Sequence, residues 1–302
     1  MKTIEAFERD IIIQTQFLYV FKPQSLIPKS SQQNTIFCGS GDSLAAALLA
    51  EAFSDLRVRA ADPLDLIKNK QITKLHSVFL ISISGKTISN IKVAKLARES
   101  IAITSNPKSK LAKACVRTIE LKFPNSDVFT GGSLSFLQSA LTCISLVTNF
   151  TMPNHEQIFK KAIIEAKKVK FTKRVFLLGN LHTYPLAMYG AAKFYELLGF
   201  DAHYERIEQF SHMGLFSVKK GDTVILLEEK NPHNVQLVKN LKKLGLKVFQ
   251  PIITTSNKIS QFLFYTFFTQ MVPLLETKRK KKTDCHFVTS KNLRKVSDDM
   301  IY

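Results

Sequence analysis

The sequence is poor in the residues that mark several familiar kinds of site. It contains four cysteines, Cys38, Cys115, Cys143 and Cys285, which lie far apart and form no CxxC pair. That spacing excludes a zinc knuckle and a dithiol redox motif. We therefore expect free and mainly buried thiols.

Long hydrophobic runs are also missing. The two most apolar stretches, Leu134 to Phe150 and Phe262 to Leu275, are interrupted by Gln, Ser, Thr or Asn. Both are shorter than the roughly 20 residues that a membrane span needs. The first ten residues carry acids where a signal peptide has a basic and then an apolar segment. We therefore expect a cytoplasmic protein with reduced thiols and no membrane partner.

Acidic residues are few compared with basic ones. The 302 residues include 43 Lys and Arg but only 24 Asp and Glu, so the net charge is +19. Nucleic acid, anionic lipid and phosphorylated metabolites all suit such a surface, and a Lys-rich exterior alone also explains it. The basic run Lys278 to Lys282 is typical of a solvated face, with phosphate or RNA binding as alternatives. Because no stacking aromatics surround it, we do not expect a nucleic-acid partner.

The rest of the chain alternates short strands with helices, and it does so twice. In the first half, β-rich runs at 34–41 and 78–85 end in glycine and lead into helix-like segments. The second half starts again with a strand at 175–179 and a helix at 184–198. This alternation predicts an α/β fold of parallel sheets with helices on both faces.

Further predicted elements complete this organisation. They are a strand at 100–105, a helix candidate opened by Pro107, helices at 133–150, 155–167, 231–243 and 259–275, and strands that start at Asp222 and Lys247. We predict four parts: an N-terminal helical segment at 1–33, domains at 34–151 and 172–276, and a tail at 277–302.

The segment Ser82 to Thr87 (SISGKT) lies where a buried strand turns into a helix. Its hydroxyls stand beside helix N-terminal amides, a combination that suits a phosphate dianion at the carboxyl end of a parallel strand. The alternative is an ordinary N-cap with a glycine turn. Similar turns occur at Cys38 to Ser43 and at Thr130 to Ser133. None is a Walker A loop, and Gly39-x-Gly41 lacks the third glycine of a dinucleotide fingerprint.

Ser82 to Thr87 resembles the SxSGxT signature of the sugar isomerase (SIS) domain. In the second half, the segment 177–200 resembles that family's strand and glycine, a Tyr-Pro helix start and a Lys-x-x-Glu, and the likeness continues through Glu208 to Gly214 and Lys291 to Val296. The whole pattern is similar to the double-SIS isomerase half of glucosamine-6-phosphate synthase, without its glutaminase domain. The resemblance implies two tandem SIS domains, each with a flavodoxin-like or Rossmann-like parallel sheet.

The resemblance also implies a site for a hexose 6-phosphate. Glu196 matches the family's catalytic glutamate, His212 its ring-opening histidine and Lys295 its C-terminal active-site lysine. It implies no metal or organic cofactor, and a homodimer in which His212 is supplied across the interface. The implied substrate-binding residues are Ser40, Gly41, Ser82, Ser84, Gly85, Thr87 and Ser133.

Taken by themselves, these residues leave alternatives open. Moving a proton between C1 and C2 of a sugar requires a positioned base, and Glu196 lies at the margin of an apolar helical stripe from which it can reach a cleft. The alternative is a solvated glutamate paired with Lys193. His212 and Lys295 each also suit an ordinary surface position. The function is therefore either a phosphosugar isomerase or amino-sugar-phosphate deaminase, or a SIS protein that binds a phosphosugar without chemistry.

One helix bears on assembly. The segment 259–275 carries Phe262, Phe264, Tyr265, Phe267 and Phe268 on more than one face. A helix that is apolar all round is normally buried. We expect a single domain to cover it poorly and a twofold homodimer to bury it.

Overall fold

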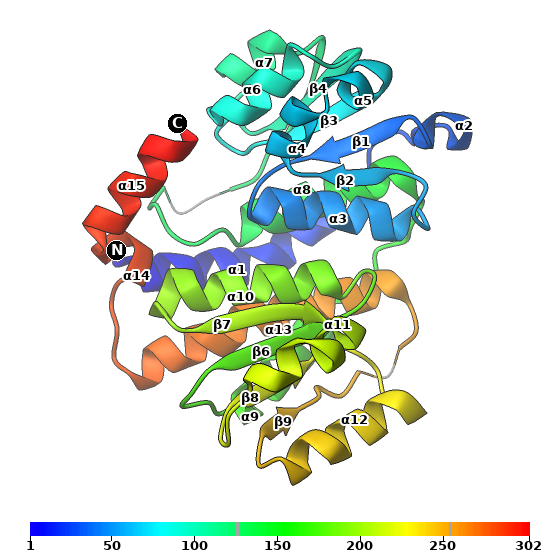
Figure 1. The fold of residues 1–302 in the computed structure, drawn as a ribbon. Helices are drawn as coiled ribbons and strands as arrows, with labels where there is room; N and C mark the ends of the chain where they lie inside the picture. The colour runs from blue at the N-terminus through cyan, green and yellow to red at the C-terminus, as the bar shows by residue number, and fades with distance from the viewer. Residues whose placement is uncertain (125–126, 254) are drawn as a thin grey trace. The chain divides into compact units, whose positions relative to one another are not determined.

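The structure is a computed structural model that describes residues 1–124, 127–253 and 255–302. The chain forms two compact units, each built around one parallel sheet (Figure 1). The five-strand unit comprises Tyr19–Ser126, Gly132–Thr151 and Ser290–Tyr302. The four-strand unit comprises Met1–Leu18, Asp127–Gly131 and Met152–Thr289. The prediction of an α/β fold with parallel sheets is confirmed.

The five-strand unit has the strand order β2-β1-β3-β4-β5. Alternate residues of the strands pack on opposite faces: Val78 and Leu80 contact one helical layer, while Phe79 stacks on Phe37 of β1 at the other face. The helices α4, α6 and α7 cover the first face, and α3 covers the second and packs against α8. The strands are β1 (Thr35–Cys38), β2 (Arg59–Ala61), β3 (Ser77–Ile81), β4 (Glu99–Thr104) and β5 (Arg117–Glu120). The helices are α2 (Lys29–Gln32), α3 (Asp42–Phe53), α4 (Pro63–Lys68), α5 (Lys70–Leu75), α6 (Ile88–Ala94), α7 (Lys110–Ala114), α8 (Leu134–Val147) and α15 (Lys291–Ile301).

The four-strand unit has the order β7-β6-β8-β9. Helix α10 packs on β6 and β7 and against α13, which in turn packs on α9, while α11 and α12 cover the opposite face. The strands are β6 (Val175–Gly179), β7 (Ala202–Arg206), β8 (Thr223–Leu226) and β9 (Lys247–Phe249). The helices are α1 (Thr3–Val20, whose last two residues fall in the other unit), α9 (His155–Lys168), α10 (Tyr184–Leu198), α11 (Ile207–His212), the 3-10 helix η1 (Gly214–Ser217), α12 (Pro232–Lys243), α13 (Lys258–Arg279) and α14 (His286–Thr289).

The expectation that only a dimer buries the phenylalanine-rich helix is wrong. Helix α13 is buried inside its own unit, where Phe267 meets Phe159 of α9 edge to face at 5.0 Å. On another side, Phe268 stacks on Phe249 of β9 at 6.0 Å. Because α9, α10 and the sheet surround α13, its apolar faces are covered without a second chain.

Local chemistry sets the ends of two other predicted elements. The helix expected from Pro107 begins at Lys110, because the Ser109 side chain accepts a hydrogen bond from the Ala112 amide and so forms the N-cap. At the end of α13, Lys278 pairs with Glu8, while Arg279 and Lys280 both reach Glu276. Part of the basic run therefore stabilises a helix end.

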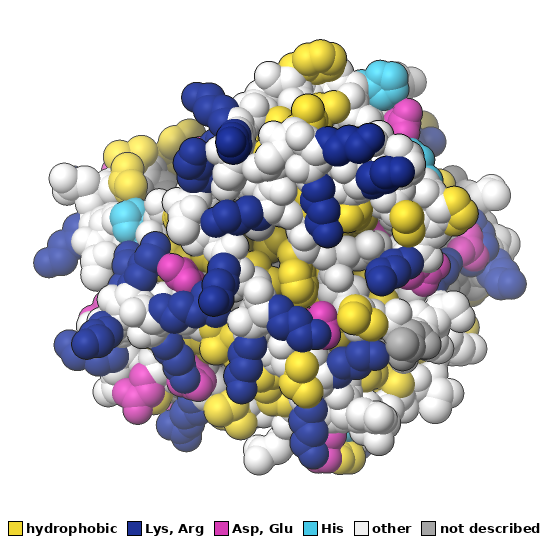
Figure 2. All heavy atoms as spheres, turned by 90° about the horizontal axis from the view of Figure 1, so that it is seen from below, with side chains coloured by type: hydrophobic (Ala, Val, Ile, Leu, Met, Phe, Trp, Pro, Cys, Tyr) yellow, Lys and Arg dark blue, Asp and Glu magenta, His cyan; other side chains and the backbone are white. Residues whose placement is uncertain are grey.

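The face drawn in Figure 2 shows how surface charge is distributed there. On the face drawn in Figure 2, Lys and Arg side chains are spread out with polar and apolar side chains between them, and no single patch dominates. All four cysteines are free, and Cys38, Cys143 and Cys285 are buried, as predicted. Within the three described ranges, none of the helices has the length and hydropathy of a transmembrane span.

Candidate active site

The loop Ser82–Thr87 stands at the carboxyl end of β3, next to the loop that follows its parallel neighbour β1. The hydroxyls of Ser82 and Thr87 lie 3.1 Å apart, so the two ends of the loop are joined. Ser82 is buried, whereas Ser84 and Thr87 are partly exposed. The structure thus brings two of the three hydroxyls that the sequence proposes for phosphate, those of Ser82 and Thr87, into contact.

Gly85 is required for this loop to adopt its shape. Its φ is +62°, and a Cβ at this position would lie 2.1 Å from Oγ of Ser109 at the start of α7. The hydroxyls of Thr104 and Ser105 both donate to the Ile83 carbonyl, at 3.0 and 2.8 Å. Neighbouring elements therefore hold the loop in place. Among the described residues, the Ser84 hydroxyl accepts one long bond of 3.3 Å from the Lys86 amide.

A second group of predicted residues lies at the starts of α3 and α8. Ser40 is exposed, and Gly41 has a φ of +58°. The hydroxyl of Ser133 is buried and finds no hydrogen-bond partner among the described residues. The preceding Gly132 approaches α3 so closely that a Cβ would lie 2.5 Å from Oδ2 of Asp42. A buried hydroxyl without a partner carries a desolvation cost, which a bound polar ligand relieves.

Glu196 lies in the four-strand unit, on α10. Its Oε2 accepts a hydrogen bond of 2.6 Å from the ammonium of Lys193, which is completely buried. That ammonium also lies 4.7 Å from the centre of the Tyr189 ring. At Gly131, a Cβ would come within 2.9 Å of the same Oε2, so the absence of a side chain keeps space beside the carboxylate. The predicted pair exists, but its cation is a core residue instead of a solvated one.

His212 and Lys295 occupy different surroundings. His212 ends α11 and is 70% exposed, with its Nε2 3.1 Å from the carboxylate of Glu208. The structure does not bring its ring to the Lys193–Glu196 pair. Lys295 is exposed on α15, a helix in which no residue is buried.

Comparison with known protein families finds a match in the second half of the chain. Residues 170–273 match the SIS domain family. The protein contains a SIS domain. No curated protein is significantly similar to the chain in sequence.

The similarity to solved structures extends over nearly the whole chain. Glucosamine-6-phosphate deaminase from Thermotoga maritima has a TM-score of 0.69 at 19% identity, covering 93% of this chain and 95% of that one. The C-terminal domain of glucosamine-fructose-6-phosphate aminotransferase from Francisella tularensis gives 0.65 at 14%, covering 89% and 94%. Tagatose-6-phosphate ketose/aldose isomerase from Escherichia coli gives 0.67 at 16%, covering 92% and 90%. The chain therefore shares its fold with these solved structures.

In the matched four-strand unit, a glutamate stands at the carboxyl end of β8, the strand whose place in its sheet corresponds to that of β3 in the other unit. Glu228 follows β8 and accepts hydrogen bonds from the hydroxyl of Thr183 at 2.7 Å and the amide of Asn180 at 3.0 Å. Burial is the main cause that raises the pKa of Glu228. Glu228 therefore already occupies these two donors at the carboxyl end of β8.

Two features of the candidate site escaped sequence reasoning. The burial of Lys193 depends on tertiary packing, since the spacing Lys-x-x-Glu also suits two solvated residues. Asp42 follows the predicted Ser40–Gly41 turn, yet only the fold shows that Gly132 lies against its carboxylate. Among the described residues, no group of three or more His, Cys, Asp and Glu side chains is arranged to hold a metal ion.

Proposed function

We propose that this protein is an enzyme that acts on a hexose 6-phosphate, either as an aldose-ketose isomerase or as an amino-sugar-phosphate isomerase or deaminase. The observation that carries the proposal is the 2.6 Å pair of a fully buried Lys193 with the partly exposed Glu196. An ordinary surface glutamate needs no buried cation, because burying an ammonium is costly. A carboxylate that must keep one position beside a substrate does need such an anchor.

The phosphate is assigned to the Ser82–Thr87 loop. Hydroxyls of Ser82, Ser84 and Thr87 donate to its oxygens, and the unpartnered Ser133 hydroxyl binds the sugar. Glu196 removes the proton from one of the two carbons C1 and C2 and returns it to the other through an enediolate. In a deaminase, water then replaces the amino group, which leaves as ammonia.

His212 and Lys295 enter this proposal through a second copy of the chain and through the tail. We assign His212 of the partner subunit to ring opening, because the ring of an exposed His212 is free to face a second chain. Next to it, Met213 and Phe216 are 62% and 86% exposed, as expected for residues that a partner covers. We assign Lys295, on the exposed α15, to covering the bound sugar.

The second candidate is a SIS protein that binds a phosphosugar and performs no reaction. The exposed His212–Glu208 pair favours it, since neither side chain is held near the Lys193–Glu196 pair. The sequence around His212 also differs from the family pattern, with Phe210 and Ser211 before the histidine and Leu215 after Gly214. Under this alternative, the hydroxyl loop binds the ligand and Glu196 only orients it.

A panel of sugar phosphates tests both candidates. Fructose 6-phosphate, glucose 6-phosphate and glucosamine 6-phosphate are first screened by thermal shift and then assayed for interconversion and ammonia release. Ser84→Ala and Thr87→Val are expected to weaken binding, whereas Ser89→Ala on the neighbouring α6 is the matched control. Turnover supports the enzyme. Stabilisation of the wild type without turnover of any of the three supports the binding protein.

A further inference from the structure

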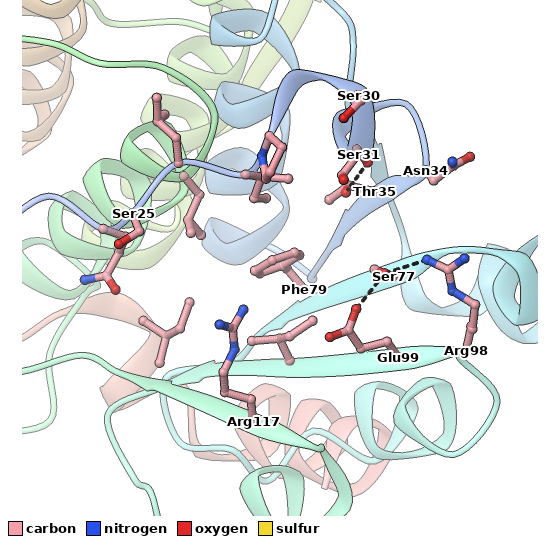
Figure 3. Close-up of a pocket in the computed structure, with 17 residues that line it drawn as sticks. Ser25, Ser30, Ser31, Asn34, Thr35, Ser77, Phe79, Arg98, Glu99 and Arg117 are labelled. Carbon is pink, nitrogen blue, oxygen red and sulfur yellow. Dashed lines mark hydrogen bonds between the residues drawn. The ribbon is translucent and has the colours of Figure 1, made fainter.

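A cavity of about 480 Å³ lies at the amino ends of the strands of the five-strand unit (Figure 3). Its lining comes from the starts of β1, β3, β4 and β5, from the segment 24–31 and from Leu146 near the end of α8. The volume falls in the range of about 300–1,000 Å³ typical of small-molecule sites. Ser77 begins β3 and Ser82 follows it, so a rise of about 3.3 Å per residue separates the cavity from the proposed phosphate loop by roughly 17 Å.

The exposed lining of the cavity is mainly polar. Phe79 and Ile101 reach it from the strands, but they are only 3% and 1% exposed. A ligand in this cavity therefore meets hydroxyl, amide and charged groups, and it must be hydrophilic throughout. The segment 24–31 and the turn before β1 contribute the side chains of Ser25, Ser30, Ser31 and Asn34.

Strand register places two opposite charges on one face of the sheet. Glu99 begins β4, and two residues further on Ile101 is paired with Arg117 of β5. Residues two apart on a strand share a face, so the side chains of Glu99 and Arg117 stand on the same side of the sheet. A rise of about 6.7 Å along β4 and a spacing of about 4.8 Å between strands put their Cα atoms about 8 Å apart.

Neither of these charges has an ion-pair partner in the part of the chain that the structure describes, and Arg117 has no hydrogen-bond partner there either. Oε2 of Glu99 accepts a hydrogen bond of 2.8 Å from the hydroxyl of Ser77, which in turn accepts one of 3.1 Å from Arg98. Among the same residues, Oε1 of Glu99 has no partner. In Figure 3 the two charged groups extend from neighbouring strands into the same open space. The cavity thus holds an unused guanidinium and an unused carboxylate oxygen.

Hydrogen bonds hold the segment 24–31 in place beside these strands. The Ile27 amide donates to the carbonyl of Leu146 at 2.8 Å, and the Gln24 amide donates to the hydroxyl of Ser145 at 3.0 Å. The buried side-chain amide of Gln32 donates to the carbonyl of Ile27 at 3.1 Å. The segment is therefore tied to α8, and the cavity is formed before any ligand arrives.

We propose that this cavity binds a small polar amino acid in its zwitterionic form. The guanidinium of Arg117 donates two parallel hydrogen bonds to the carboxylate of the ligand, and the ammonium of the ligand donates to Oε1 of Glu99. Two such hydrogen bonds of about 2.8 Å, with the short amino acid between them, bridge the gap between the two side chains.

The pair of charges also selects against other ligands. A second anionic group on the ligand would face the carboxylate of Glu99, and a second cationic group would face Arg117. The polar side chain of the amino acid is directed to the hydroxyls of Ser30 and Ser31. Because the cavity lies at the far end of the sheet from the phosphate loop, the amino acid and a phosphosugar occupy the protein at the same time.

Titration calorimetry with L-serine and L-asparagine tests the proposal. For each amino acid, one analogue lacks the amine (3-hydroxypropionate, succinamate) and one lacks the carboxylate (ethanolamine, β-alaninamide). We expect at least one amino acid to bind at one site per chain, at least tenfold more tightly than either of its analogues, because each analogue loses a charged hydrogen bond. Bulk attraction to the net charge of +19 favours the anionic analogues, so it cannot produce this preference.

Substitutions locate the binding. Arg117→Gln and Glu99→Gln are each expected to weaken the amino acid at least tenfold. Arg59→Gln on β2 and Glu120→Gln on β5 are the matched controls, because both residues are exposed on strands of this sheet but lie outside the cavity. Ser84→Ala in the proposed phosphate loop leaves amino-acid binding unchanged. A loss with Ser84→Ala instead places the amino acid at the phosphosugar site and overturns the proposal.

A measurement on the wild type makes the test independent of any variant. Phenylglyoxal modifies accessible arginines, and mass spectrometry follows each site. The bound amino acid is expected to protect Arg117 and to leave Arg59 reactive. The proposal is overturned if neither amino acid saturates, if an analogue binds as tightly as its amino acid, if Arg117→Gln and Arg59→Gln have equal effects, or if the amino acid leaves the modification of Arg117 unchanged.

Discussion

The ammonium of Lys193 lies 2.6 Å from Oε2 of Glu196, and it is fully buried while the carboxylate is 28% exposed. Residues three apart lie on the same side of a helix, so the pair itself follows from the sequence. Its asymmetry does not. One partner is fixed in the core against the Tyr189 ring, and the other extends from the core toward the surface.

Glu196→Gln is expected to lower turnover of the hexose 6-phosphate substrate by about 10² to 10⁴-fold, the usual contribution of a general base. Binding changes little, because the amide keeps the size and one acceptor oxygen of the carboxylate. Initial rates and thermal shift with the same ligand measure both effects. Glu156→Gln, at an exposed position on α9, is the control. Wild-type turnover in Glu196→Gln excludes this residue as the base.

Lys193→Met separates the role of Lys193 in positioning Glu196 from its effect on the stability of the fold. The substitution replaces a buried cation with an apolar side chain of similar length, so we expect the urea midpoint to stay level or rise. Turnover is expected to fall by at least tenfold, because Glu196 loses the partner that fixes its position. Lys160→Met on the exposed side of α9 provides the control. A variant that loses stability while its kcat stays at the wild-type value contradicts the positioning role.

Gly85→Ala is expected to disturb the phosphate loop. A positive φ costs an alanine about 1 kcal/mol or more, and here the new methyl group also meets Ser109. Gly221→Ala is the comparison, since Gly221 has a φ of +89° but only an ordinary contact of 3.5 Å to the Lys173 side chain. Urea unfolding and sugar-phosphate binding are measured on both. If the two variants lose stability and sugar-phosphate affinity to the same extent, the result argues against a tight fit at Gly85.

Glu228 makes the stability of the four-strand unit depend on pH. Burial raises the pKa of Glu228, so the folded chain holds a proton on this carboxyl more tightly than the unfolded chain. The contribution of Glu228 to stability therefore falls as pH rises from the ordinary glutamate value through the raised pKa. Glu228→Gln keeps an acceptor for Thr183 and Asn180 and removes the charge.

We accordingly expect the urea midpoint of Glu228→Gln to exceed that of the wild type at pH 7. The difference between the two midpoints narrows as pH falls toward about 4, because the wild-type carboxyl becomes protonated in the folded state first and then in the unfolded state. Glu156→Gln, at an exposed position on α9, is measured alongside as the control. A gap of constant size across this range contradicts a raised pKa at Glu228.

The proposed dimer is tested by complementation. Light scattering at micromolar concentration is expected to give twice the mass of the chain. Mixed dimers of Glu196→Gln and His212→Ala are expected to regain activity, because one of their two sites combines an intact Glu196 with an intact partner His212. Mixing Glu196→Gln with a double variant that carries both Glu196→Gln and His212→Ala is expected to restore no activity, because neither chain then has an intact Glu196. A monomeric mass, or mixtures as inactive as their components, rejects an active site shared between chains.

Much of the fold follows from local pattern. The strand Val175–Gly179 and the helix Tyr184–Leu198 have the bounds expected from the sequence, because apolar runs, a proline at the helix start and Gly199 at its end are local signals. The hydroxyl loop Ser82–Thr87 was predicted for the same reason. Its glycine and hydroxyls lie within six consecutive residues.

Tertiary structure decided what depends on neighbours distant in the chain. The sequence alone indicated that the helix containing Phe267 is buried, but only packing showed that α9, α10 and β9 cover it within one chain. The sequence indicated that Glu196 is a candidate base that can pair with Lys193, but only the fold showed that Lys193 is buried. The cavity at Arg117 has no sequence motif, because strand register brings its residues together from four strands. Burial and register are properties of the folded chain, so residue spacing alone does not determine them.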